Sequence, residues 1–218
     1  MRNLIIFGDS QFAERIYKYI SLEGVDKVIA FTQEASYIRH GKKLKIPVLP
    51  FESLSQKVSV EFEIIIGIGY SEMNNLRKKI YLLCKQYGFT IGSYISANAF
   101  VYSDSYSEGL FVCPGAVIGP NCTIGVCNFF GSNSALSHDN KIGDYNFIST
   151  GSIIGGFAKI NNNCFLGLNS TVRDNIEIAD FSLVGASANV IKSTETQSVY
   201  IGNPARKMKE LNINRIRI

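Results

Sequence analysis

Two histidines and five cysteines are the side chains of this 218-residue chain best suited to acid–base, nucleophilic or metal chemistry. The histidines are His40 and His138, and a three-histidine metal site cannot be built from them. The cysteines are Cys84, Cys113, Cys122, Cys127 and Cys164. Their odd number and the absence of a CxxC pair favour neither a disulfide framework nor a structural zinc site. We therefore expect no metal, and any catalytic imidazole must come from one of the two histidines.

A six-residue repeat fills the second half of the chain. Every sixth residue from Val112 to Val190 is apolar, and a small residue usually follows it. This period predicts a parallel β-helix, in which each unit forms one flat side and the large apolar side chains stack inward. The unbroken register also predicts that no long loop is inserted between these two residues.

The register tells the two histidines apart. His138 comes two residues after the inward-facing Leu136, so its side chain is expected to face outward. Because an imidazole can gain or lose a proton near neutral pH, an outward histidine is a candidate for acid–base chemistry. His40 lies in the basic stretch 39–43 and is expected to be a solvated loop residue.

The first half of the chain alternates strand-like and helix-like patterns. Short apolar runs are typical of buried parallel strands, and apolar residues at helical spacing predict the helices between them. We expect strands at 4–7, 28–31 and 62–66, and helices at 12–23 and 73–87. This order predicts βαβ units and a small parallel sheet.

Two glycine-containing loops follow predicted strands in this first half. Ligands of parallel sheets bind at the carboxyl ends of the strands, where the loops 8–11 and 67–70 are expected. The GxGxxG fingerprint is absent after Gly8, so a mononucleotide or sugar nucleotide is favoured over NAD. Close packing of strand and helix would by itself also explain Gly8.

Composition and charge narrow the class of protein further. With 46% hydrophobic residues, the chain can bury a core and is not intrinsically disordered. Its 22 basic and 18 acidic residues give +4, a charge too weak and scattered to indicate nucleic-acid binding. No apolar run approaches the roughly 18 residues of a membrane span, and the N-terminus does not resemble a signal peptide. We expect a soluble cytoplasmic protein.

The hexads resemble those of the hexapeptide-repeat acyltransferases, whose repeats fold into a left-handed β-helix. With the α/β part in front, nearly the whole chain resembles the NeuD- and PglD-type sugar O- and N-acyltransferases. The segment Asn203–Lys207 after Gly202 resembles the G-x-P-A-[KR] ending of these enzymes. The resemblance implies a Rossmann-like sugar-nucleotide-binding domain at 1–95, a left-handed parallel β-helix acyltransferase domain at 96–208 and a C-terminal tail at 209–218.

The string His-Asp-x-x-Ile-Gly at 138–143 resembles the catalytic segment of this family. The resemblance implies that His138 is the general base of an acetyl-CoA-dependent acetyl transfer, oriented by Asp139. It places the N–H of Gly156 as the donor to the tetrahedral oxyanion. The acceptor would be the amino group of a nucleotide-linked amino-deoxy sugar used in surface polysaccharide or glycan biosynthesis.

The same resemblance implies two sets of binding residues. Phe147, Leu168 and Ala186 would lie along the acyl and pantetheine part of CoA, and Arg206 and Lys207 near its phosphates. The residues that match the sugar-nucleotide site are Gly8, Asp9, Ser10, Gln11, Phe12, Thr32, Gln33, Gly69 and Tyr70. Related N-acetyltransferases carry a second histidine where this chain has Phe147, and often acidic residues near Thr32. The acyl group and the nucleotide base therefore stay open.

Outward aromatic residues on the β-helix raise the question of its oligomeric state. They are Phe129, Phe147, Phe157, Phe165 and Phe181. Left in solvent they would form apolar patches, so we expect burial against other subunits. The homotrimer of the family, with active sites shared between neighbours, satisfies this expectation.

Two alternatives to the N-acetyltransferase stay open at this stage. One is an O-acetyltransferase of a sialic-acid-like sugar that uses the same base and donor. The other is a non-catalytic β-helix scaffold whose first domain only binds a nucleotide.

Overall fold

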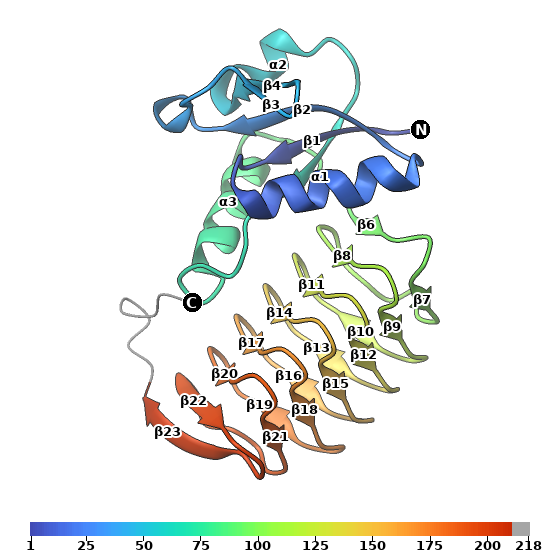
Figure 1. Cartoon of the computed structure of the whole chain (residues 1–218), viewed down its shortest axis with the longest axis vertical. Helices are drawn as coiled ribbons and strands as arrows, with labels where there is room; N and C mark the ends of the chain where they lie inside the picture. The colour runs from blue at the N-terminus through green and yellow to red at the C-terminus, as the bar shows by residue number, and fades with distance from the viewer. Residues whose placement is uncertain (211–218) are drawn as a thin grey trace. The chain divides into compact units, whose positions relative to one another are not determined.

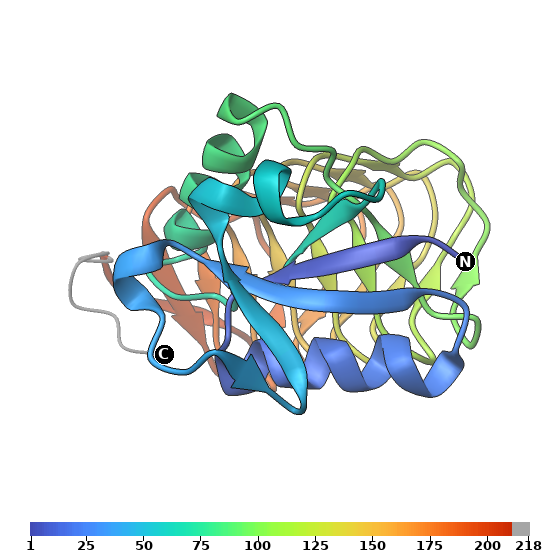
Figure 2. The same cartoon turned by 90° about the horizontal axis from the view of Figure 1, so that it is seen from above.

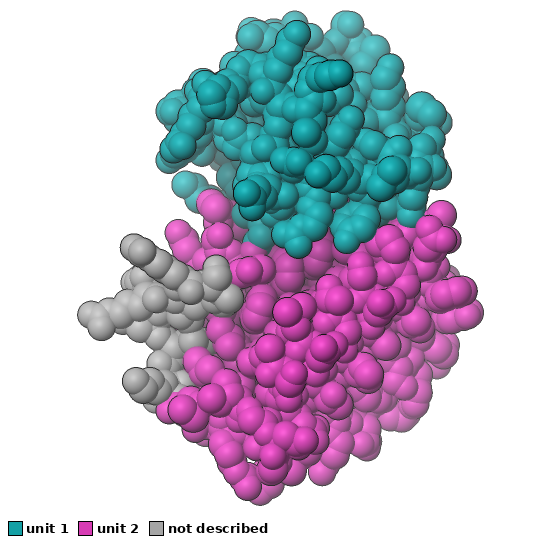
Figure 3. Space-filling view, viewed as in Figure 1, with its two compact units in different colours: residues 1–69, 79–94 teal, residues 70–78, 95–218 magenta. Residues whose placement is uncertain are grey.

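The computed structural model describes residues 1–210, which form two compact units (Figures 1 and 3). Unit 1 contains residues 1–69 and 79–94, and unit 2 contains residues 70–78 and the chain from Ile95 onward. The predicted tail 209–218 lies outside the described residues from position 211 on.

Unit 1 is built on a five-stranded sheet in the order β3-β4-β2-β1-β5, parallel except for the β3–β4 pair. Its strands are β1 Asn3–Phe7, β2 Lys27–Gln33, β3 Lys42–Lys43, β4 Ile46–Pro50 and β5 Glu63–Ile66. The helices are α1 Gln11–Glu23, α2 Leu54–Lys57 and, from residue 79 on, α3 Asn75–Gln86, with two short 3-10 helices, η1 Ala35–Tyr37 and η2 Phe51–Ser53. The predicted βαβ arrangement is therefore confirmed.

The apolar run of β1 is explained by the two helical layers that cover the sheet. α1 lies on one face, and α2 with the part of α3 from residue 79 lies on the other (Figure 2). Leu4, Ile5 and Ile6 are all fully buried as a result. α1 begins after Ser10, whose hydroxyl accepts from the N–H of Ala13, so the helix points its capped N-terminus at the loop that follows β1.

Unit 2 is a three-sided parallel β-helix whose coils are stacked one on another (Figure 1). Its eight-stranded sheet contains β6 Tyr94–Ile95, β8 Phe111–Val112, β11 Phe129–Phe130, β14 Phe147–Ile148, β17 Phe165–Leu166, β20 Leu183–Val184, β22 Ser198–Ile201 and β23 Arg206–Glu210. The six-stranded sheet contains β7 Phe100–Val101, β9 Val117–Ile118, β12 Ala135–Leu136, β15 Ile153–Ile154, β18 Thr171–Val172 and β21 Asn189–Val190. The four-stranded sheet contains β10 Thr123–Ile124, β13 Lys141–Ile142, β16 Lys159–Ile160 and β19 Glu177–Ile178.

The predicted register of the repeat holds along the whole β-helix. From β7 to β22 each strand pairs in parallel with the strand one coil away, as Ile124 does with Ile142, whereas β23 runs antiparallel to β22. Every sixth residue from Val112 to Val190 is buried in one continuous core. The small polar residues at the corners bond to the backbone of the next coil: the amide of Asn140, for example, donates to the carbonyl of Gly155 at 2.7 Å. Stacking thus buries the apolar side chains and supplies hydrogen-bond partners for many of the corner polar groups, whereas Ser134 Oγ and Asn146 Nδ2 are buried without one among residues 1–210.

One face of the β-helix is covered by a short segment of the same unit, Tyr70–Lys78, here called the cover segment. Glu72, Met73 and Asn74 have positive φ angles, so the chain turns sharply there and α3 begins at Asn75. Helical spacing from Met73 onward predicts an earlier start; the three left-handed residues are the reason for the difference.

No helix within residues 1–210 is long and apolar enough to cross a membrane.

Candidate active site

His138 lies at the corner between β12 and β13, where the chain passes from the six-stranded to the four-stranded sheet. Leu136 is buried in the core, and the His138 side chain two residues later is 48% exposed. The β-helix thereby presents an imidazole on its outer surface at a rigid corner. His40 is also exposed, but it lies in the loop before β3 of unit 1.

Asp139 contacts the imidazole directly. Its Oδ2 lies 2.8 Å from His138 Nδ1. The carboxylate is an acceptor, so the contact favours a proton on Nδ1 and leaves Nε2 as the basic nitrogen. Asp139 itself is fixed from the preceding coil, because its N–H donates to the carbonyl of Pro120 at 3.0 Å and Asn121 Nδ2 donates to its Oδ1 at 3.2 Å. Sequence patterns point to Asp139 but give no indication of Asn121, because that contact arises only when coils stack.

Gly156 lies against the His138 ring from the following coil. A Cβ at position 156 would come within 2.6 Å of His138 Cε1 and 2.7 Å of Nε2, so only glycine fits beside the imidazole. Nothing among the described residues accepts a hydrogen bond from its N–H. Phe157, which is 54% exposed, makes an edge-on contact with the imidazole at a centroid distance of 5.2 Å. The structure therefore brings together the three residues predicted as catalytic.

This arrangement combines a base and an adjacent backbone donor. A histidine whose Nδ1 is held by a carboxylate can take a proton on Nε2 from an attacking amine or hydroxyl. An N–H that has no acceptor among the described residues can donate to an oxygen on which negative charge develops. Side by side, the two groups can promote acyl transfer.

The residues predicted to contact CoA lie elsewhere on the β-helix. Leu168 and Ala186 are exposed at the corner between the eight-stranded and six-stranded sheets, whereas His138 is at the next corner. Arg206 and Lys207 are exposed on β23, and Lys207 Nζ lies 2.7 Å from Glu195 Oε2 in an exposed ion pair. A single chain does not bring these four residues to His138.

Phe147 is in a different environment from the one predicted. It lies in a stacked column along the eight-stranded sheet, here called the aromatic column: Phe111, Phe129, Phe147 and Phe165. Tyr70 of the cover segment packs edge-on against Phe147 and Phe165, with centroid distances of 4.9 Å to each. Phe147 is only 6% exposed. The expectation that Phe147 and Phe165 need another subunit to bury them is wrong, because the chain covers them itself.

In unit 1 the two predicted glycine loops meet at the carboxyl edge of the sheet. β1 lies between β2 and β5: the strands that follow it in the sequence are first added on one side of β1, and β5 is then added on the other side. This change of direction creates a switch point at the carboxyl end of β1. Gly8 has a φ of 111°, and a Cβ on it would lie 3.0 Å from the carbonyl of Gly67. Gly69 lies beside the ring of Phe12, and Gln11 is exposed at the first turn of α1. These loops form the edge at which a ligand of this sheet would bind.

The polar residues at this edge have different contacts. Gln33 Nε2 donates to Asp9 Oδ2 at 3.1 Å and to the carbonyl of Tyr37 at 2.9 Å, which fixes the half-buried Asp9. Thr32 is completely buried, and its hydroxyl donates to the carbonyl of Leu49. Its predicted contact with a substrate is not supported, because the side chain is used within the sheet. Tyr70, predicted to join these loops, packs in unit 2 instead.

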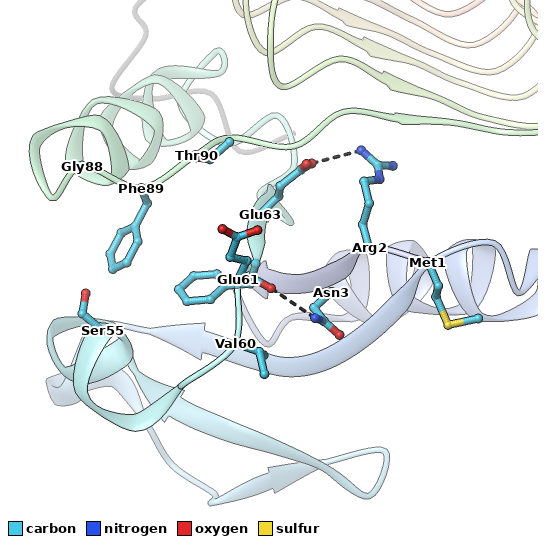
Figure 4. A pocket seen from close by; sticks show the side chains of 11 residues that line it. Met1, Arg2, Asn3, Ser55, Val60, Glu61, Glu63, Gly88, Phe89 and Thr90 are labelled. Carbon is cyan, nitrogen blue, oxygen red and sulfur yellow. Dashed lines mark hydrogen bonds and ion pairs between the residues drawn. The ribbon is translucent and has the colours of Figure 1, made fainter.

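A recess of about 630 Å³ lies at the opposite, amino edge of the same sheet (Figure 4). Figure 4 shows Arg2 directed at Glu63, to which its Nη1 donates at 3.0 Å, and Asn3 bonded to the carbonyl of Glu61. Because its polar groups already contact one another and none of the predicted site residues lines it, this recess is not the candidate site.

Within residues 1–210, no cluster of three or more histidine, cysteine, aspartate or glutamate side chains could hold a metal ion.

Comparison with known proteins shows which family and which solved structures this chain resembles. Residues 3–82 match the family described as the PglD N-terminal domain. Over 95% of this chain and 99% of the other, the fold matches the acetyltransferase domain of PglB from Neisseria gonorrhoeae FA1090 in complex with acetyl coenzyme A, with a TM-score of 0.84 and 20% identity.

Two further structures have the same fold. PerB from Caulobacter crescentus, in complex with CoA and GDP-perosamine, matches with a TM-score of 0.81 and 22% identity over 96% of this chain and 98% of that one. WeeI from Acinetobacter baumannii AYE matches with a TM-score of 0.70 and 18% identity over 95% and 100%. The prediction of a Rossmann-like domain followed by a left-handed β-helix is confirmed. Residues 3–82 match the PglD N-terminal domain family, and the chain as a whole has the fold of these three solved structures.

Proposed function

We propose that this protein is an acetyl-CoA-dependent N-acetyltransferase that acts on the amino group of a nucleotide-linked amino-deoxy sugar. The observation that carries the proposal is the corner at His138. There an exposed imidazole is bonded to a carboxylate at 2.8 Å and lies against a glycine whose N–H has no acceptor within the described part of the chain.

Each of these groups has one task in the proposed reaction. When bound, acetyl-CoA supplies an acyl group activated as a thioester. His138 Nε2 removes the proton of the amine as its nitrogen forms a bond to the acyl carbon, and Asp139 stabilises the resulting imidazolium. The N–H of Gly156 donates to the oxygen of the tetrahedral intermediate. The imidazolium then returns its proton to the departing sulfur, and the products are the amide and the CoA thiol.

The solved structures with this fold support the choice of substrates. The PglB acetyltransferase domain was solved with acetyl coenzyme A, and PerB with CoA and GDP-perosamine, a nucleotide-linked amino sugar. In unit 1 of this chain, Gly8 and Gly67 meet at the switch point of the sheet, where the capped N-terminus of α1 favours an anionic group such as a diphosphate. We assign the sugar nucleotide to this edge, with Asp9, Ser10, Gln11, Phe12, Gln33 and Gly69 as candidate contacts.

We further propose that the active enzyme is a homotrimer in which the CoA site lies between subunits. Leu168 and Ala186 lie at a different corner from His138, and a cofactor held between two neighbouring chains can contact the first corner of one chain and the second corner of the other. Between these corners the six-stranded sheet has exposed apolar side chains, with Phe100 57% and Ile153 51% exposed. A second copy of the chain would bury them.

Sedimentation should show a trimer that Ile153→Glu dissociates and that Lys159→Glu, on the four-stranded sheet, leaves intact. A monomeric wild-type protein with full activity would contradict this.

The acceptor can be identified with a panel of nucleotide-linked amino sugars. The protein and acetyl-CoA are incubated with UDP-, dTDP- and GDP-linked 3- or 4-amino sugars, and thiol release is followed together with the mass of the product. The proposal predicts that the CoA thiol is released with at least one amino sugar and that the mass of the product rises by one acetyl group, which is attached to nitrogen. Thiol release with a sialic-acid-like sugar but with no amino sugar would favour O-acetyl transfer, and no release with any acceptor would favour the scaffold.

A further inference from the structure

Asn121 is one coil before the proposed base and is bonded to its carboxylate partner. Its Nδ2 donates to Asp139 Oδ1 at 3.2 Å, while the other carboxylate oxygen contacts His138 Nδ1 at 2.8 Å. The two oxygens of Asp139 thus have separate partners. Since rotation of the carboxylate would break both contacts, the amide of Asn121 fixes the plane in which Asp139 meets the imidazole.

The backbone around Asn121 holds this geometry in place. Asn121 and Asp139 occupy equivalent corner positions in successive coils, and both have left-handed backbones, with φ angles of 58° and 54°. The N–H of Asp139 donates to the carbonyl of Pro120, the residue just before Asn121. The corner stacking therefore sets the separation between amide and carboxylate before any ligand binds.

We propose that Asn121 is a positioning residue for the reaction: through Asp139 it holds His138 in the tautomer with a proton on Nδ1 and a basic Nε2. The proposal rests on the proposed role of His138 as base. Asn121 contacts neither the imidazole nor Gly156, so it acts only through the carboxylate. Partners of this kind fix the tautomer and orientation of a histidine, and their loss typically lowers activity about tenfold or more.

The left-handed corner provides a matched pair of variants. Asn121→Gly removes the amide, and glycine adopts the required φ without strain. Asn133→Gly is the control, because Asn133 is also exposed and has a φ of 56° at another corner. The proposal predicts that kcat of acetyl transfer falls about tenfold in Asn121→Gly, with KM for acetyl-CoA unchanged. Asn133→Gly should keep the wild-type kcat. Equal kcat values in the two glycine variants would overturn the proposal.

A double-mutant cycle tests whether Asn121 acts through Asp139. The Asn121→Gly change should lower kcat about tenfold in the wild-type background but have little further effect in Asp139→Ala. The same tenfold loss in both backgrounds would show that Asn121 does not act through the carboxylate.

Histidine NMR provides a readout that does not depend on activity. With only two histidines in the chain, side-chain ¹⁵N signals can be assigned, and His40 serves as the internal reference. Asn121→Gly should lower the share of neutral His138 rings that carry the proton on Nδ1, and Asn133→Gly should not. An unchanged share in Asn121→Gly overturns the proposal, whatever its kcat. If wild-type protein acetylates no sugar in the panel, the proposed function fails, and the tautomer measurement still decides the role of Asn121.

Discussion

At the scale of single residues, the candidate site depends on contacts between coils. Asp139 follows His138 in the sequence, whereas Asn121 and Gly156 come from the coils before and after it. Each contact is therefore as rigid as the stacking of the β-helix. Small displacements of the imidazole should be costly, because a shift of about 1 Å in a reacting group can lower a rate by about two orders of magnitude.

Gly156→Ala tests this directly. The new methyl group would come within 2.7 Å of His138 Nε2, so the imidazole must move. We expect kcat to fall between about tenfold and a hundredfold, while the thermal midpoint changes little. Gly41→Ala is the control, because a Cβ there meets nothing within 4 Å. Wild-type kcat in Gly156→Ala would mean that the ring position observed here is not the one used in the reaction.

At the scale of elements, the cover segment is fastened by buried polar contacts as well as by Tyr70. Arg77 is only 4% exposed, and it donates to the carbonyls of Cys127 and Asn146 at 2.9 and 3.2 Å and to Asn74 Oδ1 at 2.9 Å. Burial lowers the pKa of Arg77 to about 10. Its guanidinium also lies over the ring of Phe147, 5.4 Å from the centroid. The segment therefore belongs structurally to the β-helix.

Replacing this arginine should loosen the cover. Arg77→Met keeps much of the volume but leaves the Cys127 carbonyl and the Asn74 amide oxygen without a donor, at a cost of about 2–4 kcal/mol in the free energy of unfolding. Lys79→Met, two residues later and exposed, is the control and should change it by less than about 0.5 kcal/mol. Urea unfolding measures both. Equal urea midpoints for the two variants would contradict the role given to Arg77.

The repeat was the most predictable element, and the cover segment the least. Fourteen positions at a strict period leave one register for the β-helix, and it also determines that His138 faces outward. The cover segment has no such periodicity: Met73 continues a helical pattern in the sequence, yet its left-handed φ sets it outside α3. In unit 1, β4 escaped prediction because the prolines in Ile46–Pro50 hide a strand. Contacts between coils, such as that of Asn121 with Asp139, can be identified in the folded structure but not in the sequence.

At the scale of the whole molecule, all five cysteines are buried as free thiols. Burial raises the pKa of both Cys84 and Cys164 to about 12, from an ordinary value of 9.0. Because the pKa of these thiols is higher in the folded than in the unfolded state, the stability that the protonated thiols contribute is complete below about pH 9. This contribution is lost as the pH rises towards 12. The protein should therefore lose stability in alkaline solution.

The contribution of a single thiol to this pH dependence can be measured separately. Between pH 9 and 11, in the presence of a reductant, the free energy of unfolding should fall with pH, each thiol contributing at most about 1.4 kcal/mol per pH unit. Cys164→Ala keeps a small side chain at its corner and should flatten the slope by up to that amount. An unchanged slope in this variant would contradict the assignment.

The role of His138 as the base of an acetyl transfer can be tested by comparing the two histidines of the chain. With acetyl-CoA and the acceptor identified by the panel, kcat is measured for wild type, His138→Ala and His40→Ala. Removing a general base typically lowers a rate by about 10²- to 10⁴-fold, so His138→Ala should lose that much while His40→Ala keeps the wild-type rate. Sedimentation should show the same assembly for all three proteins. A kcat for His138→Ala within about twofold of wild type would contradict this role.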